Sequence, residues 1–166
     1  MKLVVKTALL LFILASCKVR YGFTGADIPA EAKTVSVAYF QNNAALANPN
    51  YSQRITEALK DIFISQTRLN LVPNNGDLRY EGNVTGYDIR PVAIQGNETA
   101  SLNRLTISVN VKYVNTFDAK KNFEQTFSRF VDFNSNQQLS AIEEELMNEI
   151  NKQLVQDIFD RSLSNW

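Results

Sequence analysis

The 166-residue sequence contains no histidine and a single cysteine, Cys17. Without histidine the chain lacks the commonest general base, the usual pH switch near neutrality and the commonest protein ligand of zinc. A lone cysteine cannot form a disulfide within the chain, and a Ser-His-Asp triad is excluded. We therefore expect no enzyme of the common hydrolytic classes, no metal and no cofactor. An enzyme without a recognisable motif remains the only catalytic alternative.

The sequence also lacks an excess of positive charge, because 17 Lys and Arg residues are balanced by 17 Asp and Glu residues. It has only six glycines, and none of them forms a phosphate-binding loop motif. The equal numbers of basic and acidic residues argue against a broad basic surface for nucleic acid. Any basic site for an anionic ligand must therefore be local.

No apolar run reaches the roughly 20 residues that span a bilayer. A shorter apolar run lies between Lys6 and the sequence Leu14-Ala15-Ser16-Cys17. A charged start, a short apolar stretch and small residues at its end predict a secretory signal peptide over residues 1–16. The ending resembles the lipobox of bacterial lipoprotein signals, in which the cysteine is acylated and becomes the first mature residue. We therefore expect a lipid anchor on Cys17; the alternative is a cysteine removed with the signal.

Hydrophobic periodicity predicts one domain over residues 33–166, joined to Cys17 by a tether over residues 17–32. Alternation indicates strands over residues 33–40, 78–89, 105–113 and 123–133, with a β-bulge near Gly86. Helical spacing indicates helices over residues 51–68 and 139–163, the second starting with a capping box of Ser140 and Glu143. The fold class predicted is α+β, in the order β-α-β-β-β-α. Two helices would pack on one face of a four-stranded, mostly antiparallel sheet as a two-layer sandwich.

The segment from Arg90 to Arg104 joins two of these strands and is longer than a hairpin requires. One interpretation is a flexible hairpin tip, or strands that continue further than the pattern shows. The other is a projecting lobe that inserts into a partner, with its arginines available to a phosphate or carboxylate. The basic residues considered as contacts for an anionic lipid or a partner are Arg90, Arg104, Lys112, Lys120, Lys121 and Arg129.

Several stretches together resemble one known family. They are residues 21–25 (YGFTG), 33–44 (KTVSVAYFQNNA), 56–59 (TEAL), 63–67 (FISQT), 91–100 (PVAIQGNETA) and the ending from Asp157 to Trp166. The chain is similar to the lipopolysaccharide-assembly lipoprotein family LptE, in its Bacteroidetes-type form. The resemblance runs over nearly the whole mature chain.

The resemblance implies a non-enzymatic lipoprotein of the outer membrane that plugs the β-barrel LptD, helps it assemble and supports lipopolysaccharide transport to the outer leaflet. The polar sheet face would meet the barrel's polar lumen. The loop containing Pro91, Ile94, Gly96 and Asn97 would insert into the barrel. The alternative is a module that binds lipopolysaccharide directly through a local basic site. The expected partners are thus an LptD-like barrel, the membrane through the lipid anchor and possible direct contact with lipopolysaccharide, but no nucleic acid.

Overall fold

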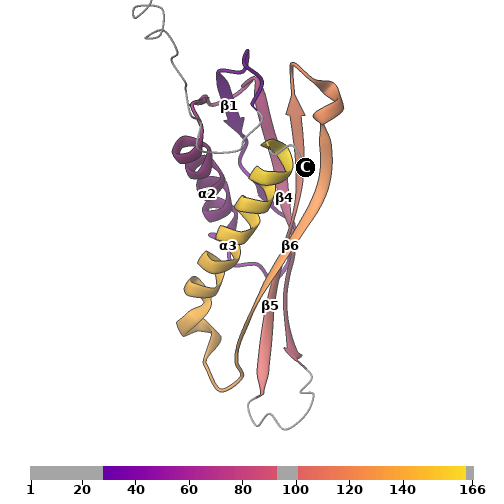
Figure 1. Ribbon diagram of the computed structural model, residues 1–166. Helices are drawn as coiled ribbons and strands as arrows, with labels where there is room; N and C mark the ends of the chain where they lie inside the picture. The colour runs from indigo at the N-terminus through magenta and orange to yellow at the C-terminus, as the bar shows by residue number, and fades with distance from the viewer. Residues whose placement is uncertain (1–27, 93–100, 164–166) are drawn as a thin grey trace, which may run out of the picture.

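The computed structural model describes residues 28–92 and 101–163, which form two layers (Figure 1). Two helices, α2 (Tyr51–Gln66) and α3 (Leu139–Leu163), lie on one side of a six-stranded sheet. None of the helices in this part of the chain is long and apolar enough to cross a membrane. The predicted signal peptide, Cys17 and three residues of the predicted inserting loop, Ile94, Gly96 and Asn97, lie outside the described residues.

The sheet has the strand order β3-β1-β4-β5-β6, and β2 pairs separately with β4. The strands are β1 (Thr34–Val37), β2 (Gln41–Asn42), β3 (Asn70–Leu71), β4 (Leu78–Val92), β5 (Leu102–Asn115) and β6 (Phe123–Asn134). The last three form an antiparallel meander, whereas β1 runs parallel to β3 and β4, and β2 runs parallel to β4.

This topology confirms the α+β class with two helices but corrects the sheet, which has six strands of mixed direction instead of four mostly antiparallel strands. The parallel pairs arise because the chain passes from β1 through α2 before it returns as β3 and β4, and a helical crossover brings strands back in the same direction. The two additional strands have two residues each, which is too short for alternation to show.

The predicted β-bulge is confirmed, because the pairing of β4 with β5 shifts between Val84 and Gly86. Before the bulge, Gly82 lies where a Cβ atom would come within 2.6 Å of the Phe40 ring and 2.5 Å of the Asn110 carbonyl oxygen. The missing side chain therefore lets the fully buried Phe40, which follows β1, pack directly on β4.

A row of aromatic rings crosses the core from helix to sheet edge. The Phe63 ring of α2 packs against the Tyr80 ring of β4 in a tilted arrangement, at 4.6 Å between centroids, and the Tyr80 ring lies 4.9 Å from the Tyr113 ring of β5. Tyr113 in turn lies 5.3 Å from Phe123 of β6. The Tyr80 hydroxyl donates to Ser162 Oγ of α3 at 2.8 Å, so the row also joins the sheet to the end of the second helix.

The β4–β5 hairpin is longer than the alternation predicted. β4 continues to Val92 and β5 starts at Leu102, so Arg90 and Arg104 both lie within strands. The interpretation in which the strands continue is thus confirmed for these two residues. The hairpin reaches the end of the sheet near the start of α3, and the β5–β6 turn lies at the other end (Figure 1).

Candidate functional site

The candidate site is the face of the meander that the two helices leave uncovered, with the base of the β4–β5 hairpin. Along β5, Leu105, Ile107, Val109, Val111 and Tyr113 are buried under the helices, and the residues between them point to the other face. That face carries Thr106, Ser108, Asn110 and Lys112, as the alternation predicted. Strand pairing therefore gives the meander one apolar face and one polar face.

The middle of this polar face is lined by small, uncharged residues. Gly86, Ser108 and Ser128 stand side by side across β4, β5 and β6, and Ser108 Oγ donates to Ser128 Oγ at 3.0 Å. The neighbouring row aligns Asn110 with Thr126 on β6. Amides and hydroxyls both donate and accept hydrogen bonds, so the surface suits a polar, uncharged counterpart.

Two arginines occupy opposite positions in the hairpin, Arg90 on β4 and Arg104 on β5. Arg104 is held by Asp132 of β6 through two hydrogen bonds of 2.7 and 2.8 Å, and its guanidinium lies 3.6 Å from the centroid of the Phe130 ring. The hydrogen bonds from Arg104 hold the pKa of the Asp132 carboxyl below its ordinary value, although burial opposes this. Arg90 is different: its side chain is 79% exposed and its ion pair with Asp88 is long, at 3.9 Å.

The other predicted contact residues lie elsewhere. Lys112 lies on the polar face toward the β5–β6 turn, 3.8 Å from Glu81. Arg129 lies opposite the buried Ile107 and pairs with Asp157 of α3, so it belongs to the helix-covered side. Lys120 and Lys121 lie in η2 (Ala119–Lys121), beyond the opposite end of β5 from Arg104. Of the six cations, Arg90 and Arg104 are the two that strand pairing places opposite each other.

Phe130 also belongs to the site, although no sequence motif identifies it as a site residue. It is 47% exposed and lies on the polar face, where the other β6 positions carry polar side chains. The signal in the sequence is this break in the alternation of residues 123–133. Its role is to support the Arg104 guanidinium by a cation–π contact.

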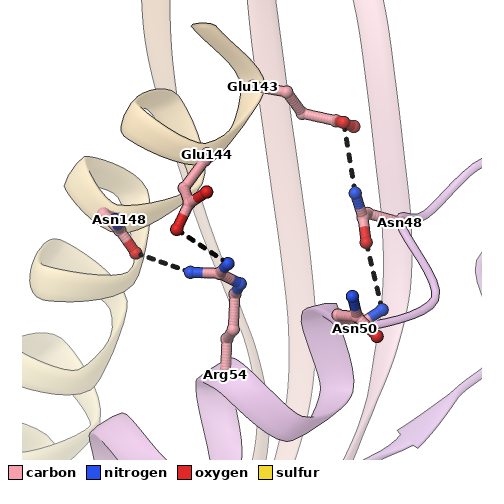
Figure 2. A network of polar contacts seen from close by, with 6 residues as sticks. All are labelled: Asn48, Asn50, Arg54, Glu143, Glu144 and Asn148. Carbon is pink, nitrogen blue, oxygen red and sulfur yellow. Dashed lines mark hydrogen bonds and ion pairs between the residues drawn. The ribbon is translucent and has the colours of Figure 1, made fainter. Parts of the chain in front are cut away.

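A polar network ties the start of α3 to α2 and to the loop before it (Figure 2). Arg54 Nη2 donates to Glu144 Oε1 at 2.9 Å, and Asn48 Nδ2 donates to Glu143 Oε2 at 3.1 Å. Helix α3 starts at Leu139, so Ser140 lies inside it and the predicted capping box is wrong. Instead, the Glu143 carboxylate joins separate elements of the fold, because it accepts a hydrogen bond from the Tyr87 hydroxyl as well as the one from Asn48.

Tyrosines inside the fold show strongly shifted pKa values without forming a reactive site. Burial raises the pKa of the Tyr87 hydroxyl, and its hydrogen bond to Glu143 raises it further. Burial likewise raises the pKa of Tyr51 and of Tyr80. Each hydroxyl donates to a neighbouring side chain: Tyr51 to Asn151 and Tyr80 to Ser162. The raised pKa values therefore come chiefly from burial, and the three hydroxyls make hydrogen bonds within the fold. Within residues 28–92 and 101–163, no group of three or more His, Cys, Asp or Glu residues could hold a metal ion.

Comparisons with known proteins agree with this architecture. No curated protein sequence matches the chain. Among solved structures, the chain is similar to lipoprotein B of Nitrosomonas europaea, with a TM-score of 0.53 and 18% identity over 87% of this chain and 88% of that one. It is also similar to a neuraminyllactose-binding hemagglutinin homologue of Helicobacter pylori, with a TM-score of 0.51 and 12% identity over 85% and 88% of the two chains. At these identities the likeness concerns the fold alone.

The family comparison goes further, because the LptE model, described as lipopolysaccharide-assembly, matches residues 32–162. This range contains all the described strands, α2 and all of α3 except its last residue, and so it includes the polar face and the hairpin. The chain therefore belongs to the LptE lipopolysaccharide-assembly family.

Proposed function

We propose that this protein is a lipid-anchored, non-enzymatic subunit of the outer membrane that plugs an LptD-like β-barrel and helps it place lipopolysaccharide in the outer leaflet. The observation that carries the proposal is the polar, uncharged middle of the uncovered sheet face, formed around Ser108 and Ser128. The lumen of a large membrane barrel is polar, and a plug needs a matching surface. The family match supports the same role.

In this proposal the signal peptide is residues 1–16 and the acylated Cys17 holds the domain at the membrane. One acyl chain gives only marginal binding, and stable anchoring takes two signals or chains. Replacing Cys17 with Ala is expected to move the protein from the membrane to the soluble fraction. Unchanged membrane retention would contradict the anchor.

The barrel partner can be tested by photocrosslinking in intact cells. A photoreactive residue at Thr126 on the polar face is expected to capture a large outer-membrane barrel protein, and a second at Pro91 tests the hairpin that leads to the inserting loop. The matched control is Glu145, an exposed position on α3 that faces away from the sheet side. Capture from Glu145 without capture from Thr126 would contradict the polar face as the contact surface.

A second candidate function, direct binding of lipopolysaccharide, is favoured by the exposed Arg90 beside the anchored Arg104. Guanidinium groups form strong, charge-assisted hydrogen bonds with phosphates. If Arg90 makes such contacts, Arg90→Ala should weaken lipopolysaccharide binding by about tenfold. Arg68→Ala removes an exposed arginine outside the polar face and serves as the control. Equal affinity of both variants and the unchanged protein would remove Arg90 from any such site.

A further inference from the structure

The β5–β6 turn, residues 115–122, presents an aromatic side chain to solvent on a rigid support. Phe117 is 48% exposed. The Asn115 side chain accepts hydrogen bonds from the backbone N–H groups of Phe117 and Asp118, at 2.9 and 3.1 Å, and the Asn122 side chain accepts from the N–H of Asn115 at 2.7 Å. The turn is therefore preorganised around an exposed apolar residue, although burying that residue would be favourable.

Basic residues follow the aromatic one within the same turn. Lys120 and Lys121 lie in η2, and the Asp118 carboxylate that precedes them is already engaged by the backbone N–H of Lys120 at 3.1 Å. An exposed aromatic ring beside lysines matches the chemistry of a membrane interface, where aromatic rings lie at the level of the headgroups and lysines attract anionic lipids.

This turn lies at the end of the domain where the described chain begins. Asp77 joins the two: its carbonyl oxygen accepts from the backbone N–H and the hydroxyl of Thr116, at 3.1 and 3.0 Å, and its carboxylate accepts from the backbone N–H of Lys33 at 2.9 Å. Figure 1 shows the same arrangement, with the first described residues and the β5–β6 turn at one end of the sheet.

The length of chain before this point limits how far the turn can lie from the anchor. Ten residues lie between Cys17 and Ile28 in the sequence, so eleven Cα-to-Cα steps join the two. Even fully extended, they span at most about 40 Å. A domain attached through Cys17 is therefore confined near the bilayer with this end closest to its point of attachment.

We propose that residues 115–122 form a membrane-contacting finger, which places Phe117 in the headgroup region of a bilayer that contains anionic phospholipid. The inference rests on the lipid anchor proposed for Cys17 and adds a second, protein-made contact with the same membrane. Its function is to fix the orientation of the domain, because attachment through Cys17 alone does not determine which side of the domain meets the bilayer.

The test uses the acylated full-length mature protein reconstituted in vesicles, with tryptophan as a depth probe. Trp166→Phe removes the native fluorophore, and Phe117→Trp in that background places the only tryptophan in the finger. The matched control is Leu46→Trp in the same background, since Leu46 is also apolar and is 76% exposed. Vesicles of phosphatidylcholine, with or without phosphatidylglycerol, carry bromine on the upper part of their acyl chains.

The expected result is a blue shift and strong bromolipid quenching for the tryptophan at position 117, and neither change at position 46. The quenching should be stronger in vesicles with phosphatidylglycerol, and Lys120→Gln together with Lys121→Gln should remove this difference. Lys60→Gln together with Lys152→Gln, two lysines on the helices, should leave it unchanged.

The proposed membrane contact is contradicted if the proteins float with the vesicles but the tryptophans at positions 117 and 46 are equally unquenched. If the acylated proteins do not float with the vesicles, the anchor fails and the finger fails with it. The two failures are thus distinguished by flotation.

Discussion

The Tyr87 hydroxyl donates a hydrogen bond of 2.6 Å to Glu143 Oε1 and so joins the middle of β4 to the first turns of α3. Glu143 also accepts from Asn48, so one carboxylate holds the strand, the helix and the loop before α2 in register. Beside it, Arg54 bridges the two helices from a more exposed position (Figure 2). The two contacts are close in space but differ in burial, and this difference gives a measurable prediction.

Tyr87→Phe is expected to lower the free energy of unfolding by about 1–2 kcal/mol, because the ring stays buried while a hydrogen bond to a carboxylate is lost. Arg54→Ala should cost less than about 1 kcal/mol, since exposed ion pairs contribute little. Urea unfolding followed by circular dichroism measures both. An Arg54 variant less stable than the Tyr87 variant would show that the exposed bridge, and not Glu143, organises this junction.

Buried tyrosines predict a loss of stability at alkaline pH. The pKa values of Tyr51, Tyr80 and Tyr87 are raised in the folded protein, chiefly by burial, whereas in the unfolded chain they return to about 10. Their contribution is therefore complete below about pH 10 and is lost as the pH rises through the folded values, because the unfolded state releases its protons first.

Tyr80→Phe should consequently flatten the decline of unfolding free energy above pH 10, although it also removes the bond to Ser162 and lowers stability at pH 7. The measurement is the unfolding midpoint in urea at a series of pH values. Tyr39→Phe is the control, because Tyr39 is 54% exposed and its replacement should leave the slope unchanged. A slope that Tyr80→Phe does not alter would contradict the assignment.

Gly82 is expected to tolerate no side chain, whereas Gly86 should accept one. A Cβ atom at position 82 would meet the Phe40 ring and the Asn110 carbonyl at distances that real contacts do not reach. Gly82→Ala should therefore destabilise the protein by about 1–3 kcal/mol through strain. At position 86 the nearest atom is Ser108 Cβ at 3.3 Å, so Gly86→Ala should cost less than about 1 kcal/mol. Thermal unfolding of the two variants gives the comparison, and equal losses would contradict it.

The sequence predicts the elements in which alternation or helical spacing extends over many residues, such as β5 from Leu105 to Tyr113 and the helix that ends near Leu163. It indicates an extended piece over residues 69–72 but does not predict that β3 pairs there, nor that β2 forms, because two residues show no period and their pairing depends on the crossover through α2. For the site, the alternation predicts the polar face but not which cations meet on it. The reason is that pairing register decides this: it sets Arg104 beside Asp132, and it places Arg129 toward α3.

Asp77 should make the fold sensitive to acid. The backbone N–H of Lys33 and the Thr34 hydroxyl hold the pKa of its carboxyl below the ordinary 3.8, although the group is accessible to solvent. Since the folded pKa is lowered, the carboxylate's contribution to stability is complete above about pH 4 and is lost as the pH falls through the folded value.

Asp77→Asn is expected to lower the unfolding free energy at pH 7 by about 1–2 kcal/mol. It should also reduce the further loss of stability below pH 4, because one titrating group is removed. Urea unfolding between pH 2.5 and pH 7 measures both effects with Asp61→Asn, an exposed helical position, as the control. If the two variants have the same pH profile, the hydrogen bonds from Lys33 and Thr34 to the Asp77 carboxylate do not depend on its charge.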